Sequence, residues 1–370
     1  MADNEVKNPG FTGIGYPEVF TTKPPQPTTK KAGQIPDAKV DEYFEQGFTI
    51  VEDFFSNEEL EPVRDSYKQL IDGIANRLYE TGRIKNLYKE YDMKERLLKL
   101  DNEWSGAAMM LIKLGKLTPE FRNLYGNEKL LNAIEQLIGP NISAHPIWNT
   151  RPKLPGVTET DVPWHQDSAY FDNDSYSTLV ATAWVAFYDT TVENGCLEFV
   201  KNGHKKGMVI NHDCCDNFYL MLFEEEMVKR LGVDPKTDFQ MCPMKAGSVI
   251  FFSNVIPHRS NPNTTDKIRW GMDLRYQKTG TPWGFYGMKS GIVLRDPDQP
   301  DLVPDWDAYD SQDRYVKQKE YEIEKTGDGK VDEFDTTISG PWMEKWQIVR
   351  HSVHVDQFLK DKGKKAQESN

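Results

Sequence analysis

A histidine and an aspartate two residues apart, joined by a second histidine far downstream, constrain the fold of this chain most. His165 and Asp167 are separated only by Gln166, and His258 lies 91 residues beyond the aspartate. Side chains at positions i and i+2 of an extended segment point to one face, so the first pair can converge on one ion while Gln166 points away. The interval before His258 leaves room for about six strands of roughly 5–6 residues. A β-sandwich or barrel can therefore return the second histidine to the same mouth.

The residues around the second histidine also read as strands. Residues 249–252 form a short apolar run, 257–263 a turn, and 268–276 an alternating segment. Arg269 stands near the start of the last segment, where it can point inward, and its planar guanidinium suits a carboxylate ligand. Two imidazoles and one carboxylate form the facial triad that binds Fe(II) and leaves other positions open. The pattern therefore favours a non-haem iron oxygenase.

Several motifs accompany these residues, within a resemblance that covers roughly residues 40–276. They are the segments 164–171, 183–184, 193–205 and 258–260, together with Arg269. As a set they resemble the phytanoyl-CoA dioxygenase family of iron- and 2-oxoglutarate-dependent oxygenases. The resemblance implies that His165, Asp167 and His258 bind the iron and that Arg269 pairs with the far carboxylate of 2-oxoglutarate. It also implies that Ser260 and Trp184 line the co-substrate pocket.

The resemblance also implies the reaction. Halogenating relatives replace the metal carboxylate by a small residue, whereas Asp167 is present here, so hydroxylation or another oxidation is expected. The expected cofactors and co-substrates are Fe(II), 2-oxoglutarate and O2, with hydroxylation of a small molecule and formation of succinate and CO2. Two other classes stay open: a non-catalytic jelly-roll protein that binds metal or a small molecule, and a cupin-type hydrolase or isomerase that holds zinc or manganese.

Candidates for the substrate pocket come from an extended segment before the metal motif and from nearby tryptophans. In residues 145–151 the alternation places Ile147, Asn149 and Arg151 on one face and Trp148 on the other. Tryptophans near the predicted mouth would suit an apolar or cationic molecule through stacking or cation–π contact, although aromatic residues of this kind also fill cores. The candidate pocket residues are Asn149, Arg151, Trp148, Trp164 and Trp270.

The order of expected elements gives a mainly β domain preceded by helices. Residues 1–36 contain six prolines and no hydrophobic period, which predicts an extended arm. Residues 37–281 are expected to form the catalytic domain, with a double-stranded β-helix, or jelly roll, as its core. Its predicted helices cover 37–46, a stretch after a capping box at Ser56 and Glu59, 106–115 and 127–138. Residues 282–370 are expected to be an extension partly packed on the core, and residues 282–287 a loop that could cover the site.

The net charge and the composition limit the kinds of partner that this protein is expected to bind. The formal net charge of −13 argues against binding to nucleic acid or to an anionic membrane, which needs clustered Lys and Arg. An acyl-CoA would also need a basic patch, and the basic segment 83–99 is more typical of a solvated helix face. No apolar run long enough for a membrane span or signal peptide is visible, so we expect a cytoplasmic protein, with the peroxisome left open. The oligomeric state is not indicated.

The cysteine spacing and a calcium-loop pattern were also considered as signs of cross-links or bound metal. The four cysteines, Cys196, Cys214, Cys215 and Cys242, show no disulfide or zinc spacing, and adjacent cysteines rarely bridge. Residues 324–335 imitate a calcium-binding EF-hand loop, but Thr326 replaces a usual acidic ligand and Asp335 stands where a bidentate glutamate usually ends the loop. We therefore expect neither a disulfide framework nor a calcium site.

Overall fold

The computed structural model describes residues 8–315 and 334–368, and its centre is a seven-stranded antiparallel sheet. Both faces of this sheet are covered, and the central strands β5 and β10 are buried along their whole length. In order across the sheet the strands are β1 (Phe48–Val51), β10 (Val249–Ser253), β5 (Val180–Ala186), β12 (Gly271–Lys278), β2 (Ile142–Ala144) and β13 (Ile292–Arg295), with β3 (Asn149–Thr150) also paired to β12.

A smaller antiparallel sheet packs on the first and completes the jelly roll. Its strands are β4 (Val162–His165), β11 (His258–Ser260), β6 (Leu197–Val200) and β9 (Phe239–Cys242). Phe199 of this sheet stacks on Phe48 at 4.7 Å between ring centroids and meets Phe252 edge-on at 5.1 Å. These contacts lie in an apolar cluster shared by the two sheets. The paired antiparallel sheets confirm the expected fold class.

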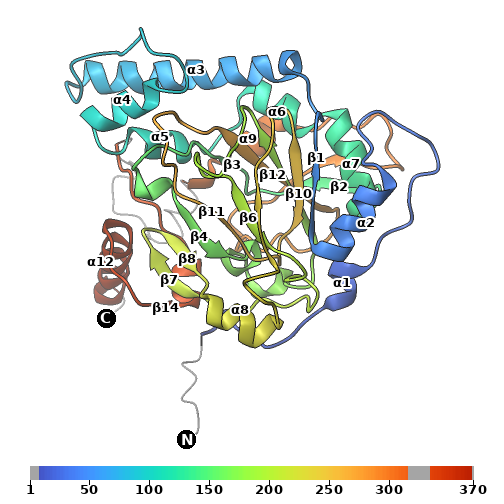
Figure 1. Cartoon of the computed structure of the whole chain (residues 1–370). Helices are drawn as coiled ribbons and strands as arrows, with labels where there is room; N and C mark the ends of the chain where they lie inside the picture. The colour runs from blue at the N-terminus through green and yellow to red at the C-terminus, as the bar shows by residue number, and fades with distance from the viewer. Residues whose placement is uncertain (1–7, 316–333, 369–370) are drawn as a thin grey trace, which may run out of the picture.

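Helices form a layer over the other face of the large sheet, with α3 lying across the top of the molecule in Figure 1. The layer comprises α2 (Asp37–Gln46), α3 (Asn57–Glu80), α4 (Arg96–Glu103), α5 (Ala107–Ile112), α6 (Pro119–Tyr125) and α7 (Glu128–Ile138). At the start of α3 the Ser56 hydroxyl accepts the Glu59 backbone N–H, and the Glu59 carboxylate accepts the Ser56 N–H, which confirms the capping box.

The segments on both sides of the expected domain pack against it. In the first 36 residues, α1 (Pro17–Thr21) buries Phe20 completely. After residue 281, β13 extends the large sheet, and a third sheet joins β14 (Gln347–Ile348) to β7 (Asp213–Asp216) and β8 (Tyr219–Met221). The remaining helices are α8 (Glu224–Leu231), α9 (Trp306–Asp310), α11 (Trp342–Lys345) and α12 (Val353–Glu368), with α12 beside the third sheet in Figure 1.

Three details differ from the sequence-based expectations or lie beyond them. The helix expected over 106–115 is shorter, because α5 ends at Ile112. Cys214 and Cys215 are joined in a disulfide between adjacent residues, contrary to the expectation that they do not bridge. Most of the calcium-loop pattern, residues 324–333, lies outside the described residues.

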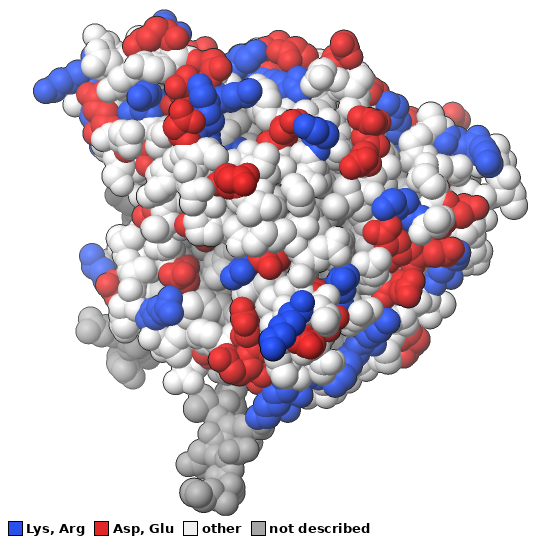
Figure 2. Space-filling model, viewed as in Figure 1, with Lys and Arg blue, Asp and Glu red and all other residues white. Residues whose placement is uncertain are grey.

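On the face shown in Figure 2, acidic and basic side chains are interspersed. Across residues 8–315 and 334–368, no helix is both long and apolar enough to cross a membrane.

Candidate active site

The pairing of β4 with β11 brings the two distant histidines together. His165 and His258 are direct partners across these antiparallel strands, and their ring centroids lie 4.2 Å apart. The chain stays extended through Gln166 and then turns into the 3-10 helix η2 (Asp167–Tyr170) at Asp167. One ligand atom from each of the two histidines and the aspartate lies within 4.8 Å of the others, and all three residues are buried. The triad expected from the sequence is thus assembled by strand register.

Hydrogen bonds orient both imidazoles toward the same point. The Nδ1 of His165 lies 2.9 Å from the Pro163 carbonyl oxygen, and the Nδ1 of His258 lies 3.1 Å from the Ile256 carbonyl oxygen. A carbonyl can only accept, so each Nδ1 carries a proton, and in the neutral form of each ring Nε2 offers a lone pair. Burial lowers the pKa of His258 to about 3, which keeps that ring neutral at pH 7. Two imidazoles that present Nε2 and one carboxylate fit Fe(II) in a facial arrangement.

The carboxylate of Asp167 is fixed by a residue that the sequence analysis missed. Arg275 on β12 donates from Nε to Oδ2 at 3.0 Å and from Nη2 to Oδ1 at 2.9 Å. Burial raises the pKa of Asp167, but the adjacent guanidinium outweighs this effect, and the pKa lies well below its usual range. Arg275 also donates to Asp273 two residues earlier. The available signal was a charged pair at i and i+2, Asp273 and Arg275, in this alternating strand.

Gln166 is turned away from the triad, as expected, and anchors the loop behind it. Its side-chain nitrogen donates to the Met208 and Val255 carbonyls, and its side-chain oxygen accepts the Ile210 backbone N–H at 2.9 Å. Its own backbone N–H donates to Nε2 of His212 at 3.0 Å. With every polar group of this buried residue satisfied, the turn that presents Asp167 is held in place.

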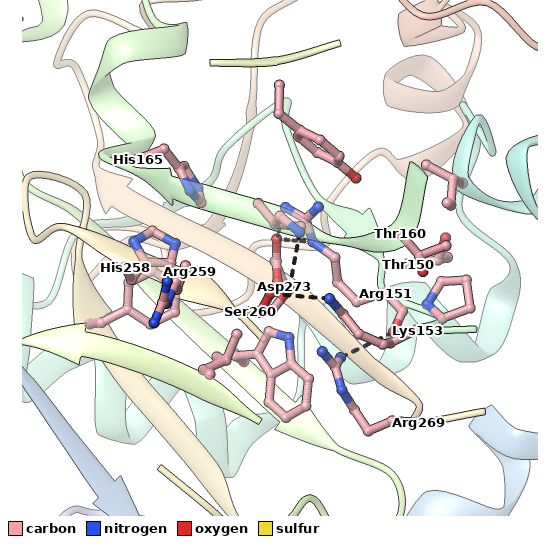
Figure 3. Close-up of a pocket in the computed structure, with 17 residues that line it drawn as sticks. Thr150, Arg151, Lys153, Thr160, His165, His258, Arg259, Ser260, Arg269 and Asp273 are labelled. Atoms are coloured by element: carbon pink, nitrogen blue, oxygen red, sulfur yellow. Dashed lines mark hydrogen bonds and ion pairs between the residues drawn. The ribbon is translucent and has the colours of Figure 1, made fainter. Parts of the chain in front are cut away.

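One cavity extends from the histidines to a buried arginine. Figure 3 shows His165 and His258 on one side of this pocket and Lys153 and Arg269 on the other. Arg269 is 3% exposed and donates only to backbone oxygens, to Gly195 at 2.9 Å and to Arg151 at 3.3 Å. Its Nε has no partner, and across residues 8–315 and 334–368 no carboxylate lies within ion-pairing distance of it. The pocket therefore ends in a positive charge without a counter-ion.

Other residues complete this first cavity. The Trp184 ring lies beneath the Arg269 guanidinium at 5.1 Å, and a Cβ at Gly271 would come within 2.0 Å of that ring, so only glycine fits there. Ser260 lines the same wall, and its backbone oxygen accepts from Lys153 Nζ at 3.1 Å. Burial, followed by the charge of Arg269, lowers the pKa of Lys153 to about 7. The predicted co-substrate residues Arg269, Ser260 and Trp184 thus line one pocket.

A second cavity opens on the other side of the triad. His165 lines both cavities, whereas Asp167 and Arg275 face the second one. Asn149 and Arg151 lie in its wall, as the alternation of the extended segment predicted. Arg151 is tied to Asp273 by contacts of 2.7 Å from Nε and 2.6 Å from Nη2. The metal triad therefore stands where two differently lined spaces meet.

Comparison with known proteins agrees with this geometry. Residues 43–271, more than half of the chain, match the family model described as phytanoyl-CoA dioxygenase (PhyH). The chain belongs to this family. This membership confirms the resemblance seen in the motifs, and the protein is a 2-oxoglutarate-dependent non-haem iron oxygenase with Fe(II) and 2-oxoglutarate as its cofactors.

Individual relatives of this dioxygenase are distant. A phytanoyl-CoA dioxygenase domain-containing protein 1 homolog of Caenorhabditis elegans is 26% identical over 281 residues, which cover 65% of this chain and 91% of the relative. An ectoine dioxygenase of Bordetella parapertussis is 23% identical over 267 residues, or 68% of this chain and 79% of the relative. Among solved structures, EvdO2 from Micromonospora carbonacea var. aurantiaca covers 68% of this chain and 94% of its own at 21% identity and a TM-score of 0.45.

The three tryptophans expected in the substrate pocket lie elsewhere in this dioxygenase. Trp148 and Trp270 are fully buried in the core between the helices and the large sheet, where Trp270 donates to the Met93 carbonyl at 3.1 Å. Trp164 packs on Phe239 in another apolar cluster. None of the three lines either of the two cavities described above, which corrects the expectation. Alternation on a strand sends Trp148 to the face opposite Asn149, and that face is core.

The C-terminal extension supplies a wall that the sequence did not reveal. Phe285, from the loop expected to cover the site, lines the second cavity. Arg314, Ile338 and Trp342 line it as well, although they follow the catalytic motifs by tens of residues. No local pattern marks these positions, because each reaches the cavity only through the packing of the extension on the jelly roll.

Proposed function

We propose that this dioxygenase hydroxylates a small organic molecule held in the second cavity, with 2-oxoglutarate held in the first. The reaction consumes one substrate C–H bond, one O2 and one 2-oxoglutarate, and yields an alcohol, succinate and CO2. His165, Asp167 and His258 would hold Fe(II), which supplies the chemistry that activates O2. The observation that carries the proposal is that the two cavities meet at this triad and differ in lining.

The first cavity fits a dicarboxylate. Arg269 is a buried cation whose only partners are neutral carbonyl oxygens, and its Nε is left free. Burial, then the charge of Arg151, lowers its pKa to about 10, so the ligand-free pocket disfavours the cation that it contains. The far carboxylate of 2-oxoglutarate would supply the missing charge and accept from the free Nε. Ser260 and Trp184 would border the same ligand.

The protein groups position these partners and exclude water. Arg275 holds Asp167 by two hydrogen bonds, so the carboxylate keeps one orientation when the metal binds. The carbonyls of Pro163 and Ile256 hold the two imidazoles in the tautomer that leaves Nε2 free. Burial of all three ligands shields the reacting centre from solvent.

A free small molecule fits this chain better than an acyl-CoA. Within the basic segment 83–99, Arg96 is already paired with Asp72 at 2.6 Å, and Lys94 lies over the Tyr188 ring at 4.5 Å. Arg83 lies over the Phe334 ring at 3.6 Å. These cations therefore serve internal contacts and are poorly placed to form a phosphate-binding patch.

Anaerobic reconstitution tests the proposal. Fe(II) and then 2-oxoglutarate are added to the wild-type protein and to His165→Ala, and the weak visible charge-transfer band of chelated iron is recorded. We expect a band that requires both additions and is lost in the variant. After O2 is admitted, succinate formation is measured. No band in a folded, iron-loaded sample would contradict the assignment of the triad, and a band without succinate under any substrate screened would indicate a binding protein.

A further inference from the structure

Arg314, from the C-terminal extension, reaches into the second cavity as a buried cation. Its side chain is 2% exposed, and the residue follows α9 in the chain. Nη2 donates to Asn149 Oδ1 at 3.2 Å and to the Tyr315 hydroxyl at 2.9 Å, and Nη1 donates to the Trp148 carbonyl. The remaining donor, Nε, is buried without a partner. The Trp148 and Tyr315 rings also lie against the guanidinium, at 5.3 and 4.6 Å from Cζ. The Nε–H is therefore the donor left for a ligand in the cavity.

The charges around this cavity do not balance. Two other arginines line it, and each has its own carboxylate: Arg151 pairs with Asp273 and Arg275 pairs with Asp167. The hydrogen-bond partners of Arg314 are all neutral oxygens, its ring contacts with Trp148 and Tyr315 are neutral too, and across residues 8–315 and 334–368 no carboxylate lies within ion-pairing distance of it. Because burial of an unpaired charge is costly, a cavity built this way favours a ligand that brings one negative charge.

The rest of the lining is mainly aromatic and aliphatic. Phe171, Phe218, Phe285 and Trp342 contribute rings from four separate parts of the chain, and Ile147 adds an aliphatic side chain. Such walls bind an apolar body through buried area and leave orientation to the few polar groups. Of the apolar or cationic molecule expected from the sequence, an apolar body fits these walls, whereas a cation would meet three arginines and only two carboxylates.

We propose that the substrate of this dioxygenase carries one carboxylate, bound by Arg314, and an apolar body that extends along the aromatic walls toward His165. The inference rests on the proposed function, because it assigns the second cavity to the substrate. Pairing at Arg314 fixes one end of the molecule, so the carbon presented to the metal triad is set by the length of the body. Arg314 is in this sense a residue that determines substrate specificity.

A purely structural role for Arg314 makes a different prediction. Its contacts with Trp148 and Asn149 also tie the extension to the segment before β4. If that tie were its whole purpose, an acid and the corresponding amide would bind alike, and substitution would lower thermal stability without changing their ratio. The acid-to-amide ratio therefore separates the two roles.

Calorimetric titration of the anaerobic Fe(II) protein, saturated with 2-oxoglutarate, tests the inference. The probes are 4-phenylbutyrate and octanoate, each compared with its amide. We expect at least one acid to bind wild type tenfold or more tightly than its amide. Arg314→Gln should abolish the preference, and Arg314→Lys, which keeps the charge, should retain part of it. Arg295→Gln, which removes an arginine paired with Glu128 and Glu135 outside the cavities, should behave as wild type.

Each other outcome counts against the inference. Equal binding of acid and amide by wild type, no binding of either acid, or an unchanged preference in Arg314→Gln would overturn it. If Arg314→Gln does not fold, the wild-type ratio and Arg314→Lys still decide the question. The charge-transfer band recorded in the same samples separates the role of Arg314 from the proposed function. A normal band without acid selectivity refutes only the role of Arg314, whereas absence of the band in wild type refutes the proposed function.

Discussion

Replacing Arg269 by methionine tests the co-substrate pocket, because the structure predicts opposite effects on ligand binding and on ligand-free stability. Like arginine, methionine is long and unbranched, so it fills much of the space beside Trp184 but carries no charge. The guanidinium is buried, lacks a counter-ion and leaves its Nε free. In the ligand-free protein this charge is destabilising, whereas in the proposed complex it would be the main anchor of the far carboxylate.

The magnitude follows from these contacts. Truncating one partner of a buried, hydrogen-bonded charge pair costs about 2–5 kcal/mol of binding free energy. At about 1.4 kcal/mol for each tenfold, Arg269→Met should weaken 2-oxoglutarate binding by roughly 30-fold to a few thousand-fold. The pKa of Arg269 is lowered to about 10, first by burial and then by Arg151, so at pH 7 the residue is charged and destabilises the empty fold. Its removal should leave the melting temperature of the ligand-free protein unchanged or higher.

Calorimetry of 2-oxoglutarate binding to the anaerobic Fe(II) protein measures the first effect, and thermal melting of the metal-free protein measures the second. Arg269→Lys should bind with intermediate affinity, since it keeps a charge but loses the two-point geometry. Arg295→Met serves as the matched control, because that arginine pairs with Glu128 and Glu135 away from the pocket. An affinity for 2-oxoglutarate within threefold of wild type in Arg269→Met would refute the assignment of this pocket.

Three further predictions concern the residues around the triad. Arg275→Met should weaken Fe(II) binding by about 10- to 100-fold, because Asp167 loses its orienting partner; a metal-competition titration measures this, and unchanged affinity would argue against the positioning role. Lys153, whose pKa lies near 7, is charged below that pH and would favour the dianion, so 2-oxoglutarate affinity should fall several-fold from pH 6 to pH 8. In Lys153→Met that slope should disappear, and a persistent slope would assign it to another group. Gly271→Ala should displace Trp184 and weaken 2-oxoglutarate binding with little change in Fe(II) binding, as separate titrations of the two ligands would show.

The sequence was informative wherever function depends on short spacing. His165 and Asp167 were recognisable because two side chains at i and i+2 must share a face of an extended segment. The helix expected over 37–46 matches α2 residue for residue, since a hydrophobic period and a glycine stop mark it locally. The family motifs extended this reach to His258 and Arg269, which no local periodicity connects.

Partnerships between distant side chains could not be predicted in this way. Arg275 could be seen as an inward-facing charge on its strand, but its pairing with Asp167 depends on how the turn after β4 packs against β12. The tryptophans show the same limit: Trp148, Trp164 and Trp270 lie near the triad in sequence, yet they fill the core. Proximity along a strand does not say which face meets a cavity.

By itself, the sequence indicated the jelly-roll fold, the triad of two histidines and an aspartate, and the arginine that we propose binds a dicarboxylate. Only the tertiary structure decided how these parts are used. Register between β4 and β11 sets the distance between the imidazoles, and the extension carries Arg314 into a cavity far from it in sequence. The physical reason is that ligand types are properties of single residues, whereas the balance of buried charge belongs to every chain segment that packs around a cavity.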